Sequence, residues 1–220
     1  MSVERLVHSK VELALHELRG GAGRPLLLLH GLGGRTASRV QDEIAAWPGP
    51  IHGLDFTGHG ESTVPHSGGY TAEVLMGDVD TALRHLGSAT LVGHGLGAYI
   101  AVLAAGARPR VVRGAILRDG LGLAGGGPQP ATPQVVFGNP SDEGPPDPYA
   151  LAELSRDVRP PDYATVYVRQ AVEYSGLDRP ISVSCVERPE WLQAVAREPG
   201  VEEASLEDAL AYYATHAAST

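Results

Sequence analysis

The residues best suited to chemistry in this sequence are histidines and carboxylates beside glycine-rich turns. His30, His59 and His94 each adjoin a glycine, and Asp119 and Glu187 each follow a run of apolar residues. Histidine and carboxylate side chains act together as base and orienting acid when they lie within mutual hydrogen-bond reach. These residues could therefore do chemistry if the fold brings them together.

These residues do not predict a metal or cofactor site. The histidines are not spaced four residues apart on one helix, and the single cysteine, Cys185, has no second cysteine to pair with. The glycine runs at 20–21 and 125–127 are not followed by the lysine that a phosphate-binding loop requires. We expect no metal and no cofactor.

Apolar runs punctuated by glycine and proline predict alternating strands and helices. Residues 26–29 are all leucine, which favours a central strand covered on both faces, whereas 11–15 alternate and predict a strand paired antiparallel with residues near 6–7. Further strands are expected at 51–54, 90–92, 111–117, 181–186 and 201–206, and helices at 38–47, 71–86, 96–107, 148–158, 162–174, 189–197 and 207–216. This order predicts an α/β fold, a mostly parallel open sheet with helices on both faces and an antiparallel N-terminal hairpin.

The length and composition favour one domain over residues 1–220. A chain of 220 residues with 43% hydrophobic content can bury one sizeable core. The region 119–161 breaks the alternation with a glycine run and many prolines, and we interpret it as a short lid inserted into the domain.

The charge pattern excludes some partners. The net charge is −9 and no basic cluster is present, so nucleic acid is not expected to bind. No apolar run reaches membrane-spanning length, the N-terminus carries charges where a signal peptide would be apolar, and the lone cysteine suits a reducing compartment. We expect a cytoplasmic protein without a membrane span; the sequence does not set its oligomeric state.

Three segments in this order and spacing resemble the α/β-hydrolase superfamily: LLLHGLGG at 27–34, DFTGHGES at 55–62 and GHGLG at 93–97. In that family the third segment reads Gly-x-Ser-x-Gly, a strained turn that lifts a serine nucleophile above the sheet. Here the middle residue is Gly95, which tolerates the backbone angles of such a turn but has no attacking oxygen. The resemblance thus implies a retained turn without the covalent chemistry.

The resemblance also implies where the other site residues lie. Backbone N–H groups of Leu32 and Leu96 would form the oxyanion hole, so that a ligand site is expected around Leu32, His94, Gly95, Leu96 and Asp119. The family's catalytic histidine follows the last strand, but the one histidine beyond His94 is His216, well inside the predicted last helix. Two of three triad members are therefore expected to be missing.

The third triad member, the acid, has two candidate positions. Asp119 and Glu187 both follow strands that carry the acid in the family, although Asp119 also suits a simple turn with Gly120.

Three functional hypotheses follow from these residues. The first is a hydrolytically inactive pseudoenzyme that resembles ester hydrolases and keeps a small-molecule pocket. The second is an unconventional lyase, cyclase or hydrolase that uses the oxyanion hole with Asp119 or His94 as acid or base. The third and weakest is an esterase with a displaced nucleophile, Ser38 or Ser62, because a serine outside the turn would not face the oxyanion donors. Convergence of Asp119 and His94 on one cavity would favour the second hypothesis.

Overall fold

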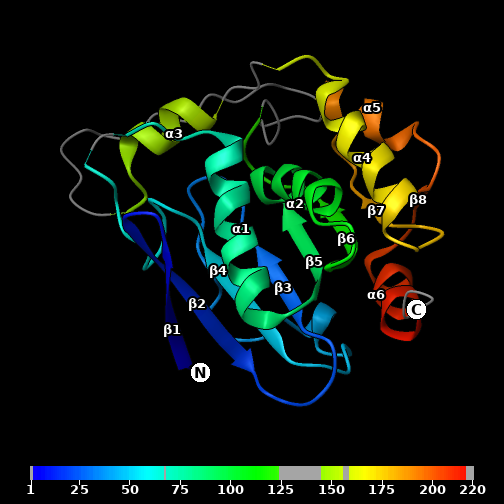
Figure 1. Ribbon diagram of the computed structural model, residues 1–220, viewed down its shortest axis with the longest axis horizontal. Coiled ribbons are helices and arrows are strands. Elements are labelled where there is room, and N and C mark those ends of the chain that lie inside the picture. The colour runs from blue at the N-terminus through cyan, green and yellow to red at the C-terminus, as the bar shows by residue number, and fades with distance from the viewer. Residues whose placement is uncertain (1, 67, 124–144, 156–158, 217–220) are drawn as a thin grey trace.

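The computed structural model describes residues 2–66, 68–123, 145–155 and 159–216, and its centre is one sheet of eight strands (Figure 1). The spatial order of the strands is β1-β2-β4-β3-β5-β6-β7-β8. Their bounds are β1 Ser2–His8, β2 Val11–Arg19, β3 Leu26–Leu29, β4 Ile51–Asp55, β5 Ala89–His94, β6 Val112–Arg118, β7 Ile181–Ser184 and β8 Val201–Glu203. The predicted α/β fold is confirmed.

The sheet is antiparallel at one edge and parallel elsewhere. β1 pairs with β2 as an antiparallel hairpin, with Leu6 opposite Leu13, and β2 pairs antiparallel with β4. All pairings from β4 through β8 are parallel. The N-terminal hairpin predicted from the alternation is therefore confirmed, and the parallel strands place their carboxyl ends along one edge, where loops can form a site.

Helices cover both faces of this sheet. Their bounds are η1 Asp42–Ile44, α1 Ala72–Leu86, α2 Leu96–Ala107, α3 Pro148–Leu154, α4 Tyr163–Tyr174, α5 Glu190–Ala196 and α6 Leu206–Thr215. Alternate residues of β3 enter different cores: Leu27 and Leu29 pack with α1 and α2, whereas Leu26 packs with η1 and α6. Figure 1 shows α1 and α2 lying across the strands. The prediction that this strand is covered on both sides is confirmed.

One predicted helix is wrong, and other boundaries differ by a few residues. The helix expected at 38–47 is only the single turn η1, because the N–H of Thr36 donates to Asp55 at 2.6 Å and holds the preceding loop against the end of β4. The last strand ends at Glu203 because the Ser205 hydroxyl accepts the N–H of Asp208 and begins α6. In the described part of the chain, no helix is long and apolar enough to cross a membrane.

The predicted lid over 119–161 is only partly described. Residues 118–123 and helix α3 belong to the described structure, whereas 124–144 and 156–158 lie outside it, including the glycine run and the end of the predicted helix at 148–158. The single-domain organisation stays a prediction.

Candidate functional site

Gly95 occupies a sharp turn between the end of β5 and the start of α2. Its backbone angles are φ 52° and ψ −111°, a conformation that residues with a Cβ rarely adopt. The flanking glycines are required by contact: a Cβ on Gly93 would lie 2.3 Å from the Gly97 oxygen, and one on Gly97 would lie 2.4 Å from the Leu29 oxygen. The sequence Gly-x-Gly-x-Gly thus produces a strained turn that packs directly on its neighbours.

Two backbone donors at this turn converge on one acceptor. The N–H groups of Leu32 and Leu96 both donate to the carbonyl oxygen of Leu121, each at 2.9 Å. Leu32 follows β3 and Leu96 opens α2, and both residues are buried. Their donors are those expected to form an oxyanion hole, and in this structure the chain's own peptide oxygen occupies the position between them.

The segment that supplies this oxygen, residues 118–122, is called the closing segment below. It begins at the last residue of β6 and passes beside Gly95. The N–H of Gly95 donates to the Arg118 oxygen at 3.0 Å. A Cβ on Gly95 would lie 2.3 Å from the Leu121 oxygen and 2.4 Å from the Gly120 carbonyl carbon. The absence of a side chain at position 95 is therefore what lets the closing segment reach the two donors.

Two further glycines permit the same approach from the other side. A Cβ on Gly120 would lie 2.8 Å from the Gly95 nitrogen, and one on Gly122 would lie 2.8 Å from the Leu96 Cβ. The space left beside Gly95 is a cavity of about 20 Å³, which is room for roughly one water molecule.

Asp119 acts as a backbone cap in this arrangement. Its carboxylate accepts the N–H of Val186 at 2.9 Å and the N–H of Glu187 at 2.7 Å, which ties the end of β6 to the chain after β7. Asp119 and Glu187 both line the small cavity beside Gly95. The carboxylate of Asp119 is thus engaged by two donors of the neighbouring loop.

His94 and Asp119 line different cavities among those formed by the described residues. The Nδ1 of His94 lies 3.3 Å from the backbone oxygen of Asp119, and its ring lines a second cavity of about 80 Å³ together with His30 and Thr36. Burial lowers the pKa of His94, with the nearby Arg118 acting in the same direction. The two residues are close in space, but they face different cavities.

His30 and His59 hold loops near the turn. The Nδ1–H of His30 donates to the Gly31 oxygen at 2.7 Å and its Nε2 accepts the N–H of Phe56 at 3.1 Å. His59 Nδ1–H donates to the Thr57 oxygen at 3.1 Å. Burial lowers the pKa of both, that of His30 to about 4. Both imidazoles are neutral at physiological pH and consistent with a structural role.

The remaining sequence candidates lie away from Gly95. His216 stacks on Tyr212 and donates to its backbone oxygen at 2.8 Å, at the end of α6 beside Arg24, which precedes β3. His216 therefore lies at the amino ends of the parallel strands, whereas Gly95 follows the carboxyl end of β5. Ser62 is buried, accepts the N–H of Ala14 at 2.9 Å and donates to a backbone oxygen, and Ser38 is exposed on the loop after β3.

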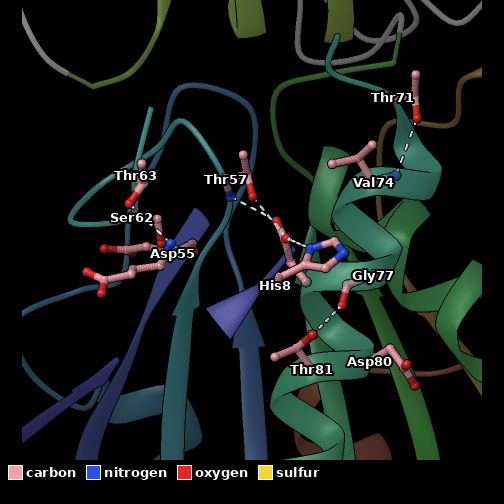
Figure 2. A network of polar contacts seen from close by, with 12 residues as sticks. His8, Asp55, Thr57, Ser62, Thr63, Thr71, Val74, Gly77, Asp80 and Thr81 are labelled. Atoms are coloured by element: carbon pink, nitrogen blue, oxygen red, sulfur yellow. Dashed lines mark hydrogen bonds and ion pairs between the residues drawn. The ribbon is translucent and has the colours of Figure 1, made fainter. Parts of the chain in front are cut away.

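Two histidine–aspartate pairs, in which both aspartates are buried, could not be predicted from the sequence. His8 on β1 pairs with Asp78 on α1 at 2.6 Å, and His16 on β2 pairs with Asp55 at the end of β4 at 2.9 Å. Thr57 donates to Asp78 through its N–H and its hydroxyl, and Figure 2 shows this network beside His8. No sequence motif links residues that far apart. The described residues contain no group of three or more ligating side chains that could hold a metal ion.

Comparison with known proteins matches this architecture to one family. A family model for the alpha/beta hydrolase fold matches residues 24–172. A curated relative named as a probable alcohol acetyltransferase, from Wickerhamomyces anomalus, is 28% identical over 118 residues, which are 51% of this chain and 34% of that protein. The chain thus spans about a third of the length of this relative.

Solved structures are similar as well. The crystal structure of a membrane phospholipase A, described as a bacterial virulence factor, aligns with a TM-score of 0.55 at 17% identity and covers 96% of this chain and 84% of that one. A haloalkane dehalogenase variant from Bradyrhizobium elkanii aligns at 26% identity with a TM-score of 0.46 and covers 55% and 40%. The matched family model spans residues 24–172, more than half of the chain, and the sheet is mostly parallel with helices on both faces: this protein belongs to the α/β-hydrolase fold family.

Proposed function

We propose that this protein is a hydrolytically inactive member of its family, in which the nucleophile turn is a structural contact between the chain's own loops. The observation that carries the proposal is the pair of hydrogen bonds from Leu32 and Leu96 to the Leu121 oxygen. An oxyanion hole stabilises a reaction only when its donors are free to bind the charge that develops on the substrate oxygen. Here both donors are already engaged, and Gly95 offers no oxygen that could attack.

The position of His216 supports the same proposal. A nucleophile needs a general base within hydrogen-bond reach, and His216 lies at the opposite ends of the parallel strands from position 95. An unconventional enzyme that used Asp119 or His94 is less well supported, because these side chains line different cavities in the described part of the chain and the Asp119 carboxylate is held by two backbone N–H groups. A displaced Ser62 is disfavoured because its hydroxyl is buried and engaged.

The proposal retains a small-molecule ligand at the turn. A ligand carbonyl would bind between Leu32 and Leu96 by taking the place of the Leu121 oxygen, with His94, Gly95 and Asp119 nearby. Such binding requires the closing segment to move, because the cavity beside Gly95 is only about 20 Å³. The protein would then act as a binding or accessory protein in the cytoplasm.

The test is hydrolysis of p-nitrophenyl butyrate by the unaltered protein, together with labelling by a fluorophosphonate that reacts with activated serines. We expect neither turnover above the rate of the urea-unfolded protein nor labelling. Turnover that disappears in Asp119→Asn or His94→Gln would favour the unconventional enzyme, and labelling lost in Ser38→Ala or Ser62→Ala would identify a displaced nucleophile. Either result would overturn the proposal.

A further inference from the structure

A large cavity formed by described residues lies away from Gly95, beside the N-terminal hairpin. It has a volume of about 520 Å³ and is called the hairpin cleft below. Its walls are the β1–β2 turn, the loop that follows β4 and the first turn of α1. This volume falls within the range of sites that hold small organic molecules.

Among the described residues that line the hairpin cleft, Lys10 carries the one charge without a partner. Lys10 is the only lysine of the chain, and among the described residues no hydrogen bond or ion pair engages its amine. The one acidic lining residue, Glu73, is neutralised by an ion pair with Arg159 and a hydrogen bond from Tyr163 at 3.1 Å. The uncompensated charge in the hairpin cleft is thus that of Lys10, in a protein with a net charge of −9.

His8 is held in one orientation at the wall of this cleft. Its Nδ1 bonds to Asp78, whose side chain is 0% exposed and also accepts both donors of Thr57. The ring lies over Gly77 of α1, where a Cβ would be 2.6 Å from its Cε1 and 2.8 Å from its Nε2; Figure 2 places the two residues side by side. Gly77 leaves room for the ring, although a glycine inside a helix costs about 1 kcal/mol of stability relative to alanine.

The second ring nitrogen of His8 belongs to a side chain that lines the hairpin cleft. Nε2 has no protein partner among the described residues, and the side chain is 23% exposed. The hydrogen bond to Asp78 raises the pKa of His8, with burial opposing it; Asp80 raises the pKa further and Arg84 lowers it. The imidazole therefore favours its cationic form more than an isolated histidine does.

We propose that the hairpin cleft binds a small organic carboxylate, with Lys10 and His8 contacting the anion and apolar side chains surrounding the rest of the molecule. Lys10 supplies a mobile charge, whereas the buried Asp78 fixes His8 so that its Nε2–H can donate a charge-assisted hydrogen bond. The side chains that would surround the apolar body are Val11, Pro65, Tyr70 and Val74. This site is independent of the turn at Gly95 and of any activity there.

The single lysine makes the proposal testable without knowledge of the natural ligand. Reductive methylation with ¹³C-formaldehyde labels Lys10 and the terminal α-amine while keeping both charges. Hexanoate is then titrated and the Lys10 methyl resonance is followed by NMR, with hexanamide as the uncharged probe of the same shape. We expect saturable shifts at Lys10 with hexanoate, and about tenfold weaker binding of hexanamide.

Two variants distinguish binding of the carboxylate in the hairpin cleft from nonspecific attraction of an anion to any positive charge on the surface. Lys10→Gln should weaken hexanoate binding about fivefold, measured by calorimetry, whereas Arg110→Gln, which removes an exposed charge outside the cleft, should leave it unchanged. Binding should weaken as the pH rises past the raised pKa of His8, and His8→Gln should remove this dependence.

Three results would overturn the proposal: equal binding of hexanamide and hexanoate, equal effects of Lys10→Gln and Arg110→Gln, or hexanoate shifts that map outside the cleft. Because Lys10→Gln alters an exposed side chain, it remains informative even if His8→Gln perturbs the fold.

Discussion

Replacing Gly95 with serine restores the family's nucleophile in sequence, and we expect it to destabilise the protein without making it an esterase. A side chain at φ 52° costs about 2 kcal/mol in backbone strain. The serine Cβ would lie 2.3 Å from the Leu121 oxygen, so the closing segment must move and two hydrogen bonds worth about 1 kcal/mol each are lost. The sum is about 4 kcal/mol, which in a chain of this size lowers Tm by roughly 8–16 °C.

The matched control is Gly87→Ser. Gly87 has φ 80° at the end of α1, but a Cβ there meets no atom within 4 Å. This variant therefore carries the backbone strain without the collision and should lose only about 1–2 kcal/mol. Urea unfolding of both variants, with p-nitrophenyl butyrate hydrolysis, makes the comparison. If Gly95→Ser is as stable as Gly87→Ser, or hydrolyses the ester, the reasoning about the closing segment is refuted.

Three further predictions concern other residues of the site. Asp119→Asn should lower the free energy of unfolding by about 1 kcal/mol through the weakened cap on the chain after β7, which urea unfolding measures; an unchanged stability would contradict the cap. The free energy of unfolding should fall as the pH drops from about 6.5 toward 4, because the pKa of buried His30 is lowered to about 4 whereas the same histidine in the unfolded chain takes up a proton near pH 6.5. In an NMR titration the chemical shift of its Cε1 proton should stay unchanged above pH 5, and a titration midpoint near 6.5 would refute this. Burial raises the pKa of Cys185 to about 12, so Ellman's reagent at pH 8 should react only after unfolding; rapid reaction of the native thiol would contradict this.

The regular elements were predictable from sequence because their signals are local. The leucine run at 26–29 and the helix opened by the Thr71 cap form where the pattern placed them, since each is long or apolar enough to overcome its surroundings. The predicted helix at 38–47 failed because a distant carboxylate, Asp55, holds the preceding loop by the N–H of Thr36. A contact of that kind leaves no periodic trace in the sequence.

The site was predictable only in its donors. The resemblance located Leu32 and Leu96, but the acceptor between them is a backbone carbonyl, and no residue type marks a carbonyl at position 121. Gly120 could be interpreted from sequence only as part of a turn with Asp119, although its lack of a side chain also permits contact with Gly95. The pair of His8 and Asp78, 70 residues apart, exists only because β1 packs beside α1.

The Leu121 carbonyl also sets a threshold for any molecule that would bind at the turn. This carbonyl is attached to the protein through the short closing segment, so it competes with any free ligand for the N–H groups of Leu32 and Leu96. Its effective concentration is at least in the millimolar range. A free carbonyl compound of ordinary affinity loses that competition at the concentrations found in solution. A molecule that succeeds must make additional contacts with the displaced segment, so selectivity at this turn would depend on a ligand's affinity for the opened loop more than on its carbonyl group.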